Sequence, residues 1–501
     1  MKHTLYTLLL MCLLTACGGP QVPEQYAQSQ ATPLIYPDYE DVTVPINIAP
    51  LNFELLIQSD ETVVRLSAAD EEIVCEGSKI RIDLDDWRAL TTKALGKAIT
   101  VEVFIQTKDQ WTRLKPFNIY VSPDSIDPWI SYRLISPSYV SYEELTLNQR
   151  CLENFEEEVF ADNMLCSTES GGQCINCHNF QQYNPDRMQF HARQTHGGTL
   201  IAYDGEVEKI DMNNDSLISA GVYPAWHPTM KLIAYSTNKT MQCFHTSSSE
   251  KIEVLDAVSD LILYDIDRHE VTTIEKQPNE LEIFPCWSPD GKWLYFCSAH
   301  FEYQTGSPDL TEIMMRAQEL KYNIYRKSFD PATKTFGPRE LVFDAARADT
   351  LHQSMSATFP RISPDGRWLL FTLGEWGCFH IWHHDADLWI MDLRSGSARP
   401  FYEINSDDTE SYHSWSSNGR WVVFSSRRYD GVFTRPFFAH IDAEGRGSKP
   451  FELPSRDPDY HRQFLKSYNV PEFMTGRVKL TPQQIAGKLK EDATPITYKS
   501  K

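Results

Sequence analysis

The chain has 501 residues, a formal net charge of −22 and 23% charged residues. An acidic surplus of this size argues against nucleic acid as a partner and against electrostatic adhesion to anionic lipid. The length predicts about two or three domains. The aromatic content of 12%, with frequent Gly, Pro and Asp, favours an all-β fold of many short strands and turns.

The N-terminus predicts export from the cytoplasm. Lys2 precedes an apolar stretch, Leu5–Leu14, that is too short to span a bilayer. We therefore expect a signal peptide over residues 1–16. Small residues directly before Cys17 resemble the lipobox of bacterial lipoproteins, which implies acylation of Cys17 and a membrane anchor. An ordinary secretory signal cleaved near Ala16 is the alternative.

The residues after Cys17 carry no acidic cluster of the kind that resembles a surface-export signal. This favours a lipoprotein on the periplasmic side, most simply at the outer membrane. Residues 17–38 are polar and lack apolar periodicity, so they predict a tether. Residues 39–124 alternate in short apolar runs, for example at 62–66, 79–84 and 99–105, which predicts a β-sandwich. This domain would be a spacer or a binding module.

Residues 125–187 predict a connector that contains the chain's most specific motif. Cys174-Ile175-Asn176-Cys177-His178 spells C-x-x-C-H. Two thiols at this spacing reach both vinyl groups of one porphyrin, and the adjacent imidazole becomes the proximal iron ligand. A thioredoxin-like pair or half of a zinc site is the alternative. The preceding Gly-Gly-Gln and the lack of a second C-x-x-C disfavour both. We therefore expect one covalent haem c.

The sixth position on the iron has two candidates on one expected strand. Met188 and His191 lie three residues apart, so they face opposite sides and only one can serve. Met188 is preferred because a thioether suits electron transfer, with a core methionine as the alternative. Upstream, Cys151 and Cys166 bracket a short loop and could form a disulfide.

Residues 188–460 are repetitive. Four segments share the same pattern. An aromatic residue is followed three positions later by Trp or Ile, then by a turn that contains Pro or Ser, and then by an alternating apolar strand. The segments begin at Tyr223, Phe284, Phe359 and Tyr412. Three of the turns contain Asp-Gly or Asn-Gly, expected to supply the two positive-φ residues of a tight hairpin. Such units bury both faces only by stacking, which predicts a β-propeller of about five to six blades. Residues 461–501 are expected to be a C-terminal extension.

These W-S-P-D-G-K/R-x-L-x-F repeats resemble the TolB-type, WD40-like propeller repeats. A degenerate copy at 184–190, followed by expected strands at 197–203 and 206–210, would place C-x-x-C-H in the entry loop of the first blade. The segment from Gly172 to Arg193 resembles that of bacterial haem-carrying propeller lipoproteins, some labelled cytochrome c biosynthesis proteins. The resemblance implies one-electron transfer with a protein redox partner, and the propeller as scaffold.

Two alternatives remain open. The first is a propeller oxidoreductase that uses open-coordinate haem or a histidine-bound metal. Recurrent histidines suit such a metal, although they could equally cap strands; they are His245, His300, His380, His383, His384 and His413. The second is a TolB-like interaction module with structural haem or none. No hydrolase signature such as G-x-S-x-G or H-E-x-x-H occurs, so no catalytic residue is assigned.

Overall fold

The computed structural model describes residues 19–136, 144–166, 173–244, 250, 252–347 and 354–500. The chain is mostly β and divides into two compact units. Unit 1 contains the described residues up to Ser125 and the later segment Pro454–Gln463, and unit 2 contains Ile126–Leu453 and Phe464–Lys501. Among the described residues, no helix has both the length and the apolarity to cross a bilayer.

Unit 1 holds a seven-stranded and a three-stranded sheet. Strands of the larger sheet are β1 (Ala27–Gln28), β3 (Thr43–Pro45), β5 (Glu61–Ala68), β6 (Glu71–Glu76), β8 (Ala98–Thr107), β9 (Gln110–Arg113) and β10 (Phe117–Ser122). Those of the smaller are β2 (Ile35–Tyr36), β4 (Phe53–Leu55) and β7 (Lys79–Ile80), and the helices are α2 (Leu84–Lys93) and α4 (Tyr460–Gln463).

Two features of unit 1 differ from the sequence prediction. The expected tether is partly folded, because β1 pairs with β9 and β2 pairs with β4. The strand expected over 79–84 ends at Ile80, because the Asp83 carboxylate accepts hydrogen bonds from the backbone N–H groups of Asp85 and Asp86. Asp83 is thus the N-cap of α2, and a cap of this kind favours helix over strand.

The described residues of unit 2 form five sheets, of four, five, nine, four and four strands. Apart from two short edge strands, they divide into six four-stranded antiparallel groups, which we call sheets 1 to 6. Sheet 1 combines β11 (Trp129–Ile135), β12 (Thr146–Cys151) and β13 (Glu157–Asp162) with the late strand β34 (Ser467–Met474). Sheet 2 is β14 (Gln173–Phe180), β15 (Arg187–Gln194), β16 (Gly198–Tyr203) and β17 (Glu206–Asp211); sheet 3 is β18 (Val222–Trp226), β19 (Leu232–Phe244), β20 (Ile252–Asp265) and β21 (Glu270–Glu275).

The other three sheets follow in chain order. Sheet 4 is β22 (Glu280–Trp287), β23 (Trp293–His300), β24 (Tyr322–Asp330) and β25 (Thr335–Phe343); sheet 5 is β26 (Ser356–Ile362), β27 (Trp368–Gly374), β28 (Asp387–Asp392) and β29 (Ser397–Pro400); sheet 6 is β30 (Glu410–Trp415), β31 (Trp421–Ser426), β32 (Arg435–His440) and β33 (Phe451–Glu452). A single bridged pair, Ser259 with Leu281, joins sheets 3 and 4.

Short elements complete unit 2. They are α3 (Leu310–Met315), α5 (Pro482–Lys490), the 3₁₀ turns η2 (Gln181–Tyr183), η3 (Ala317–Glu319), η4 (Ala345–Arg347) and η5 (His380–Trp382), and the edge strands β35 (Thr494–Pro495) and β36 (Thr497–Tyr498). The two edge strands extend sheets 2 and 3, since β35 pairs with β17 and β36 with β21.

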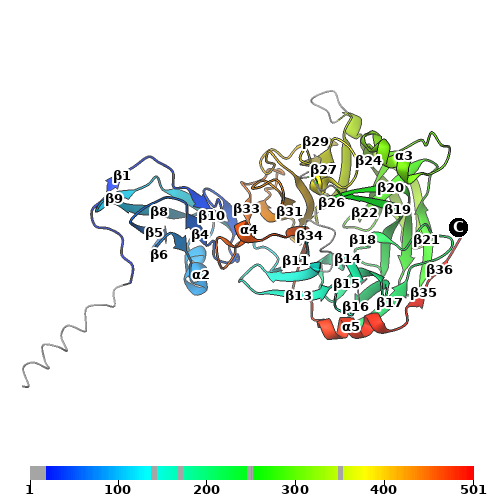
Figure 1. Ribbon diagram of the computed structural model, residues 1–501, viewed down its shortest axis with the longest axis horizontal. Helices are drawn as coiled ribbons and strands as arrows, with labels where there is room; N and C mark the ends of the chain where they lie inside the picture. Colours follow the sequence, from blue (N-terminus) through cyan, green and yellow to red (C-terminus); the bar gives the residue numbers. More distant parts are fainter. Residues whose placement is uncertain are drawn as a thin grey trace, which may run out of the picture. The chain divides into compact units, whose positions relative to one another are not determined.

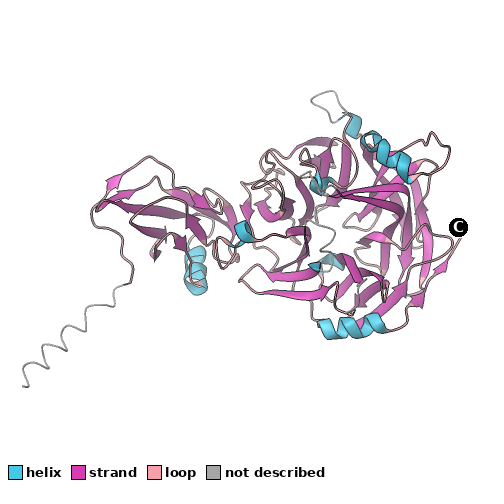
Figure 2. Cartoon of the chain, viewed as in Figure 1, coloured by secondary structure: helices cyan, strands magenta, loops and turns pink. Residues whose placement is uncertain are grey.

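The six sheets are arranged around a common centre, in a propeller-like manner (Figure 1, Figure 2). One strand of each sheet is innermost, and these inner strands are β34, β14, β18, β22, β26 and β30. Each contacts the next around the ring, and the ring closes where β34 meets β14. The expected connector is therefore part of this ring, because β11 to β14 form strands of sheets 1 and 2. The expected C-terminal extension supplies the inner strand of sheet 1 through β34.

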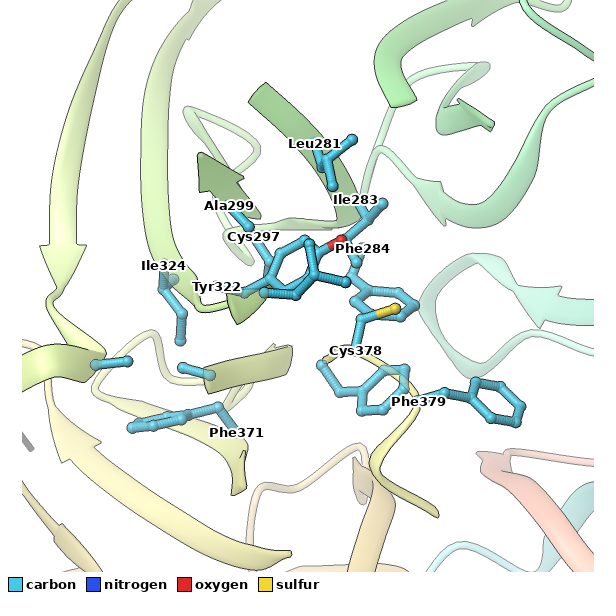
Figure 3. Close-up of a cluster of buried hydrophobic side chains, with 14 of the residues drawn as sticks. Leu281, Ile283, Phe284, Cys297, Ala299, Tyr322, Ile324, Phe371, Cys378 and Phe379 are labelled. Carbon is cyan, nitrogen blue, oxygen red and sulfur yellow. The ribbon is translucent and has the colours of Figure 1, made fainter. Parts of the chain in front are cut away.

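Apolar side chains fill the space between adjacent sheets. Figure 3 shows this for sheets 4 and 5, where Ile283 and Phe284 of one and Phe371 of the other belong to one cluster of buried side chains. The tryptophans of the repeats also tie neighbouring inner strands together. The indole N–H groups of Trp226, Trp287 and Trp415 each donate to a backbone carbonyl of the preceding inner strand. Trp at this position therefore both fills space and satisfies a buried acceptor.

The hairpin turns correct one detail of the expectation. Gly291, Gly366 and Gly419 have positive φ, whereas the Asp or Asn before each does not. In the first of these turns the Asp290 carboxylate accepts from Ser288 Oγ and from Lys292 N–H. That bonding keeps Asp290 in an ordinary turn conformation, so only the glycine needs the left-handed region.

Candidate functional site

The C-x-x-C-H motif forms the inner strand β14 of sheet 2, and not an entry loop. Cys174 pairs with Arg193 and Asn176 with His191, and the register then shifts between Asn176 and Asn179. Cys177 lies at this bulge with a φ of 59°. The degenerate copy at 184–190 forms the following hairpin, and the strands expected at 197–203 and 206–210 are confirmed as β16 and β17.

The same bulge recurs in all six inner strands. Each has one positive-φ residue at the same point of its register, and these six residues are Cys177, Tyr223, Phe284, Phe359, Tyr412 and Val470. We call them the axial ring. Four are aromatic and contact one another in sequence through edge-on or tilted rings, with ring centroids 4.5, 4.2 and 4.4 Å apart from Tyr223 to Tyr412. The Cys177 thiol contributes to the raised pKa of both Tyr223 and Tyr412, after the larger effect of burial.

His178 directly follows the axial-ring residue Cys177, as His413 directly follows Tyr412 in sheet 6. The two histidines therefore occupy equivalent positions. Both imidazoles are buried at 3% exposure, and burial lowers the pKa of each to about 3. Each interacts with the backbone of the preceding sheet, His178 with Val470 and Ser131 and His413 with Phe359 and Leu370. Sheet 6 contains no C-x-x-C-H, so this placement belongs to the repeat rather than to the motif.

The two thiols of the motif are half-buried and free of disulfide bonds. Burial raises the pKa of the Cys174 thiol, and the nearby Arg193 and Arg133 act in the opposite direction. The disulfide expected between Cys151 and Cys166 is also absent, because both are free. Cys166 Sγ instead donates to the backbone carbonyl of Ala486, at 3.5 Å.

These residues fit a haem only in part. Two free thiols and a neutral imidazole are the correct donors, and His178 Nε2 has no hydrogen-bond partner among the described residues. However, that nitrogen is fully covered by protein, so it offers no open face to a porphyrin in this conformation. No route for iron chemistry follows from the geometry as it stands.

The expected sixth ligands are both engaged elsewhere. Met188 is 1% exposed and pairs in register with Phe180 within an apolar cluster. His191 is buried, its Nδ1 lies 3.0 Å from Thr199 Oγ1, and burial lowers its pKa to about 3. Met188 thus has the contacts of a core methionine, which was the alternative to its expected role as an iron ligand. Cys17, the expected lipidation site, lies outside the described residues.

The recurrent histidines do not converge. His380 bonds to Thr358 Oγ1 and to the Trp376 carbonyl, while His383 Nε2 lies 2.6 Å from a Glu253 oxygen. His300 and His384 pair with separate surface carboxylates. Within the described ranges no group of three or more His, Cys, Asp or Glu side chains could hold a metal ion. His245 falls outside those ranges.

A polar cavity lies at the end of the inner strands, and sequence reasoning missed it. Its volume is about 180 Å³, and every one of the six sheets contributes to its wall. We call it the axial pocket. Four of its polar residues lie two positions after the axial ring, namely Asn179, Arg361, Ser414 and Glu472, with Cys286 at the same position of sheet 4; Gln182, Tyr183 and Ser288 also line it. Aromatic residues from the next position, such as Trp226 and Trp415, form its apolar wall.

Glu472 and Arg361 carry the charge of the axial pocket. Asn179 Nδ2 donates to Glu472 Oε1 at 2.7 Å. Burial raises the pKa of Glu472 to about 7, against the opposing influence of Arg361. The Arg361 guanidinium donates to the Pro360 carbonyl at 3.1 Å. The only available sequence signal was that this position varies between the repeats, in Ala225, Cys286, Arg361 and Ser414.

Comparisons with known proteins assign this chain to no family. No family model matches the chain, and no curated protein matches it. Solved structures match at low similarity. They include a chain from a study of two prolyl endopeptidases (13% identity, TM-score 0.37, 66% of this chain and 42% of that one) and prolyl oligopeptidase B from Galerina marginata (10%, 0.36, 70% and 42%). A DUF4784 family protein from Bacteroides caccae also matches (8%, 0.26, 74% and 95%). This chain thus spans less than half the length of the first two matched chains, and these TM-scores carry no argument about function.

Proposed function

We propose that this protein is a ligand-binding module built on a six-bladed β-propeller, with the axial pocket as its binding site. Sheets 1 to 6 would be the blades, and the two sheets of unit 1 a β-sandwich spacer. The observation that carries the proposal is the axial pocket itself, because one cavity receives polar and aromatic side chains from all six sheets. Sites of this composition on a rigid scaffold are typical of small-ligand recognition.

The geometry of the axial pocket supports recognition better than catalysis. Its polar groups come from equivalent positions of rigid inner strands, so they are held in fixed directions. Binding would then cost little ordering of the protein, which is the main advantage of a preformed site. The half-buried Glu472 and the nearby Arg361 would give such a site electrostatic selectivity.

A pocket-filling substitution tests the proposal. Ala225 lines the axial pocket, so Ala225→Phe should occupy it, whereas Ala332→Phe adds the same ring at an exposed turn. We expect a ligand screened by thermal shift to stabilise the wild type and Ala332→Phe but not Ala225→Phe. A ligand present at 100 times its Kd stabilises by about 2.7 kcal/mol. Stabilisation that persists in Ala225→Phe would contradict the proposed site.

A second candidate function is one-electron transfer through a single covalent haem c on Cys174 and Cys177, with a protein redox partner. The free, half-buried thiols and the unpaired His178 Nε2 favour it. The test is a haem stain and a visible spectrum after expression in a host that matures c-type cytochromes. Haem that is covalently bound in the wild type, and lost in Cys174→Ser/Cys177→Ser, would support it. A colourless, unstained wild type would rule it out.

Membrane anchoring through Cys17 accompanies either function as part of the proposal. A signal peptide over 1–16 and an acylated Cys17 would hold the protein on the periplasmic side, at the outer membrane. Several acyl chains make such anchoring stable. Fractionation of a Cys17→Ser variant tests this, and release of the variant from the membrane fraction is the expected result.

A further inference from the structure

The axial pocket carries one charged side chain of each sign, and neither is held in a close ion pair among the described residues. Of the residues that line it, Arg361 is the only cation and Glu472 the only anion. Arg361 forms no ion pair with a carboxylate anywhere in the described part of the chain. A half-buried guanidinium that makes no close ion pair keeps N–H donors available, and carboxylate and phosphate groups are the anions that such donors bind in pairs.

The size of the axial pocket limits what this partner can be. A volume of about 180 Å³ is close to that of an apolar cavity of ~150 Å³ that accommodates benzene. The surrounding Trp226, Trp287 and Trp415 provide flat apolar surfaces beside the polar groups. A small organic anion with an apolar body therefore matches both the volume and the wall, and it matches better than a bare inorganic ion.

We propose that the axial pocket binds a small carboxylate, whose anionic end pairs with Arg361 and whose apolar body packs against the tryptophan wall. This inference rests on the proposed function, because it names the ligand class of the same site. The carboxylate could be a free small acid or the C-terminus of a peptide. The cavity volume favours the free acid.

Glu472 should make this binding dependent on pH. An ionised Glu472 repels a carboxylate, and a protonated one does not. Arg361 and Tyr183 interact electrostatically with Glu472 itself. Cys286, His413 and Asp127 interact with one or both of these two neighbours. Burial raises the pKa of Cys286 and Tyr183, and that of His413 is lowered to about 3, so these three stay neutral near pH 7. Glu472, with a pKa of about 7, is then the group that titrates.

The experiment compares three probes of the same shape: benzoate, benzamide and benzamidine, which are anionic, neutral and cationic. Calorimetric titration of the full chain should show benzoate binding, with weaker binding of benzamide and none of benzamidine. Benzoate affinity should fall by about tenfold from pH 6 to pH 8 as Glu472, with its pKa of about 7, loses its proton. A short peptide with a free C-terminus, compared with its amide, separates the two sources of carboxylate.

Variants assign the effect to individual residues. Arg361→Gln should abolish benzoate binding, Arg361→Lys should retain part of it, and Arg394→Gln at an exposed turn should leave it unchanged. Glu472→Gln should bind benzoate at pH 8 as tightly as the wild type binds it at pH 6. Circular dichroism confirms that each variant is folded.

Two outcomes overturn the inference. The first is benzamidine binding that exceeds benzoate binding and is lost in Ala225→Phe. It would refute the carboxylate and leave the axial pocket as a binding site. The second is the absence of benzoate binding at both pH values. The proposed function would then depend on the ligand screen with Ala225→Phe and Ala332→Phe, so the two failures are distinguishable.

Discussion

Strands β14 and β30 occupy equivalent places in sheets 2 and 6 but carry different side chains. At the bulge β30 has Tyr412-His413, and β14 has Cys177-His178. Both histidines are buried against the preceding sheet in the same way. The comparison shows that two of the three defining residues of C-x-x-C-H lie at repeat positions. What distinguishes β14 is the second thiol, Cys174, and a small residue where four other strands place an aromatic ring.

The largest expected difference between the two strands concerns the axial ring. Tyr412 packs between Phe359 and Phe379, so Tyr412→Ala should lower the free energy of unfolding by about 3–5 kcal/mol. Cys177→Ala removes a single half-buried sulfur and should cost about 1 kcal/mol or less. Chemical denaturation measures both. A comparable loss in the two variants would mean that Cys177 does more than fill its place in the ring.

Acid should weaken both strands through their histidines. The folded-state pKa of His178 and of His413 is about 3, far below the ordinary value of about 6.5. The unfolded chain therefore binds protons first, so the stability that each histidine contributes is present above pH 6.5 and is lost as the pH falls. The loss is about 1.4 kcal/mol per pH unit for each group.

Unfolding free energies measured between pH 7 and pH 4.5 check this expectation. His413→Pro should flatten the pH profile by one proton, and His178→Pro by the same amount. An unchanged slope in either variant would show that the replaced imidazole does not titrate on unfolding.

Proline at these two positions should be tolerated. Pro224, Pro285, Pro360 and Pro471 occupy the equivalent position of the other four inner strands, so the backbone there accepts a fixed φ and needs no N–H donor. We expect His178→Pro and His413→Pro to change the unfolding free energy near pH 7 by about 1 kcal/mol. If haem is attached to β14, His178→Pro should also alter the Soret band, which His413→Pro leaves unchanged.

The smallest effect concerns thiol accessibility rather than stability. Cys174 and Cys177 are half-buried, whereas Cys297 and Cys378 are fully buried, and burial raises the pKa of both well above the ordinary value. Brief alkylation of the native protein, followed by peptide mass analysis, should label the motif cysteines before the other two. Labelling in the reverse order would show that β14 is more enclosed than its exposed fraction indicates.

The repeats made much of the fold predictable. Each Trp-containing turn and the alternating strand after it are local signals, and they correctly indicated the hairpins that start sheets 3 to 6. Sheet 1 carries no such signal, and its pairing partners β11 and β34 are more than 300 residues apart in the chain. Long-range closure of this kind leaves no pattern in a local window, which explains why residues 125–187 read as a connector and 461–501 as an extension.

The candidate site residues also differ in whether the sequence alone could identify them. Cys174, Cys177 and His178 form a contiguous motif, so sequence reasoning found them, but it could not show that His178 also occupies a repeat position. Arg361 and Glu472 are single residues from strands far apart in the chain. Only the ring of inner strands brings them to one cavity. A residue whose role depends on strands that meet only in the folded protein leaves no local pattern in the sequence.

The pairing of β34 with β11 also constrains how the molecule can form. The strand that completes sheet 1 follows its partner β11 by more than 300 residues, so it is synthesised long after β11. Until it arrives, β11 exposes an unsatisfied edge to other chains. A nascent molecule therefore depends on protection from aggregation during that interval. Once closed, sheet 1 is held together by a pairing between distant parts of the chain, so loss of the β11–β34 pairing would open the ring on this side.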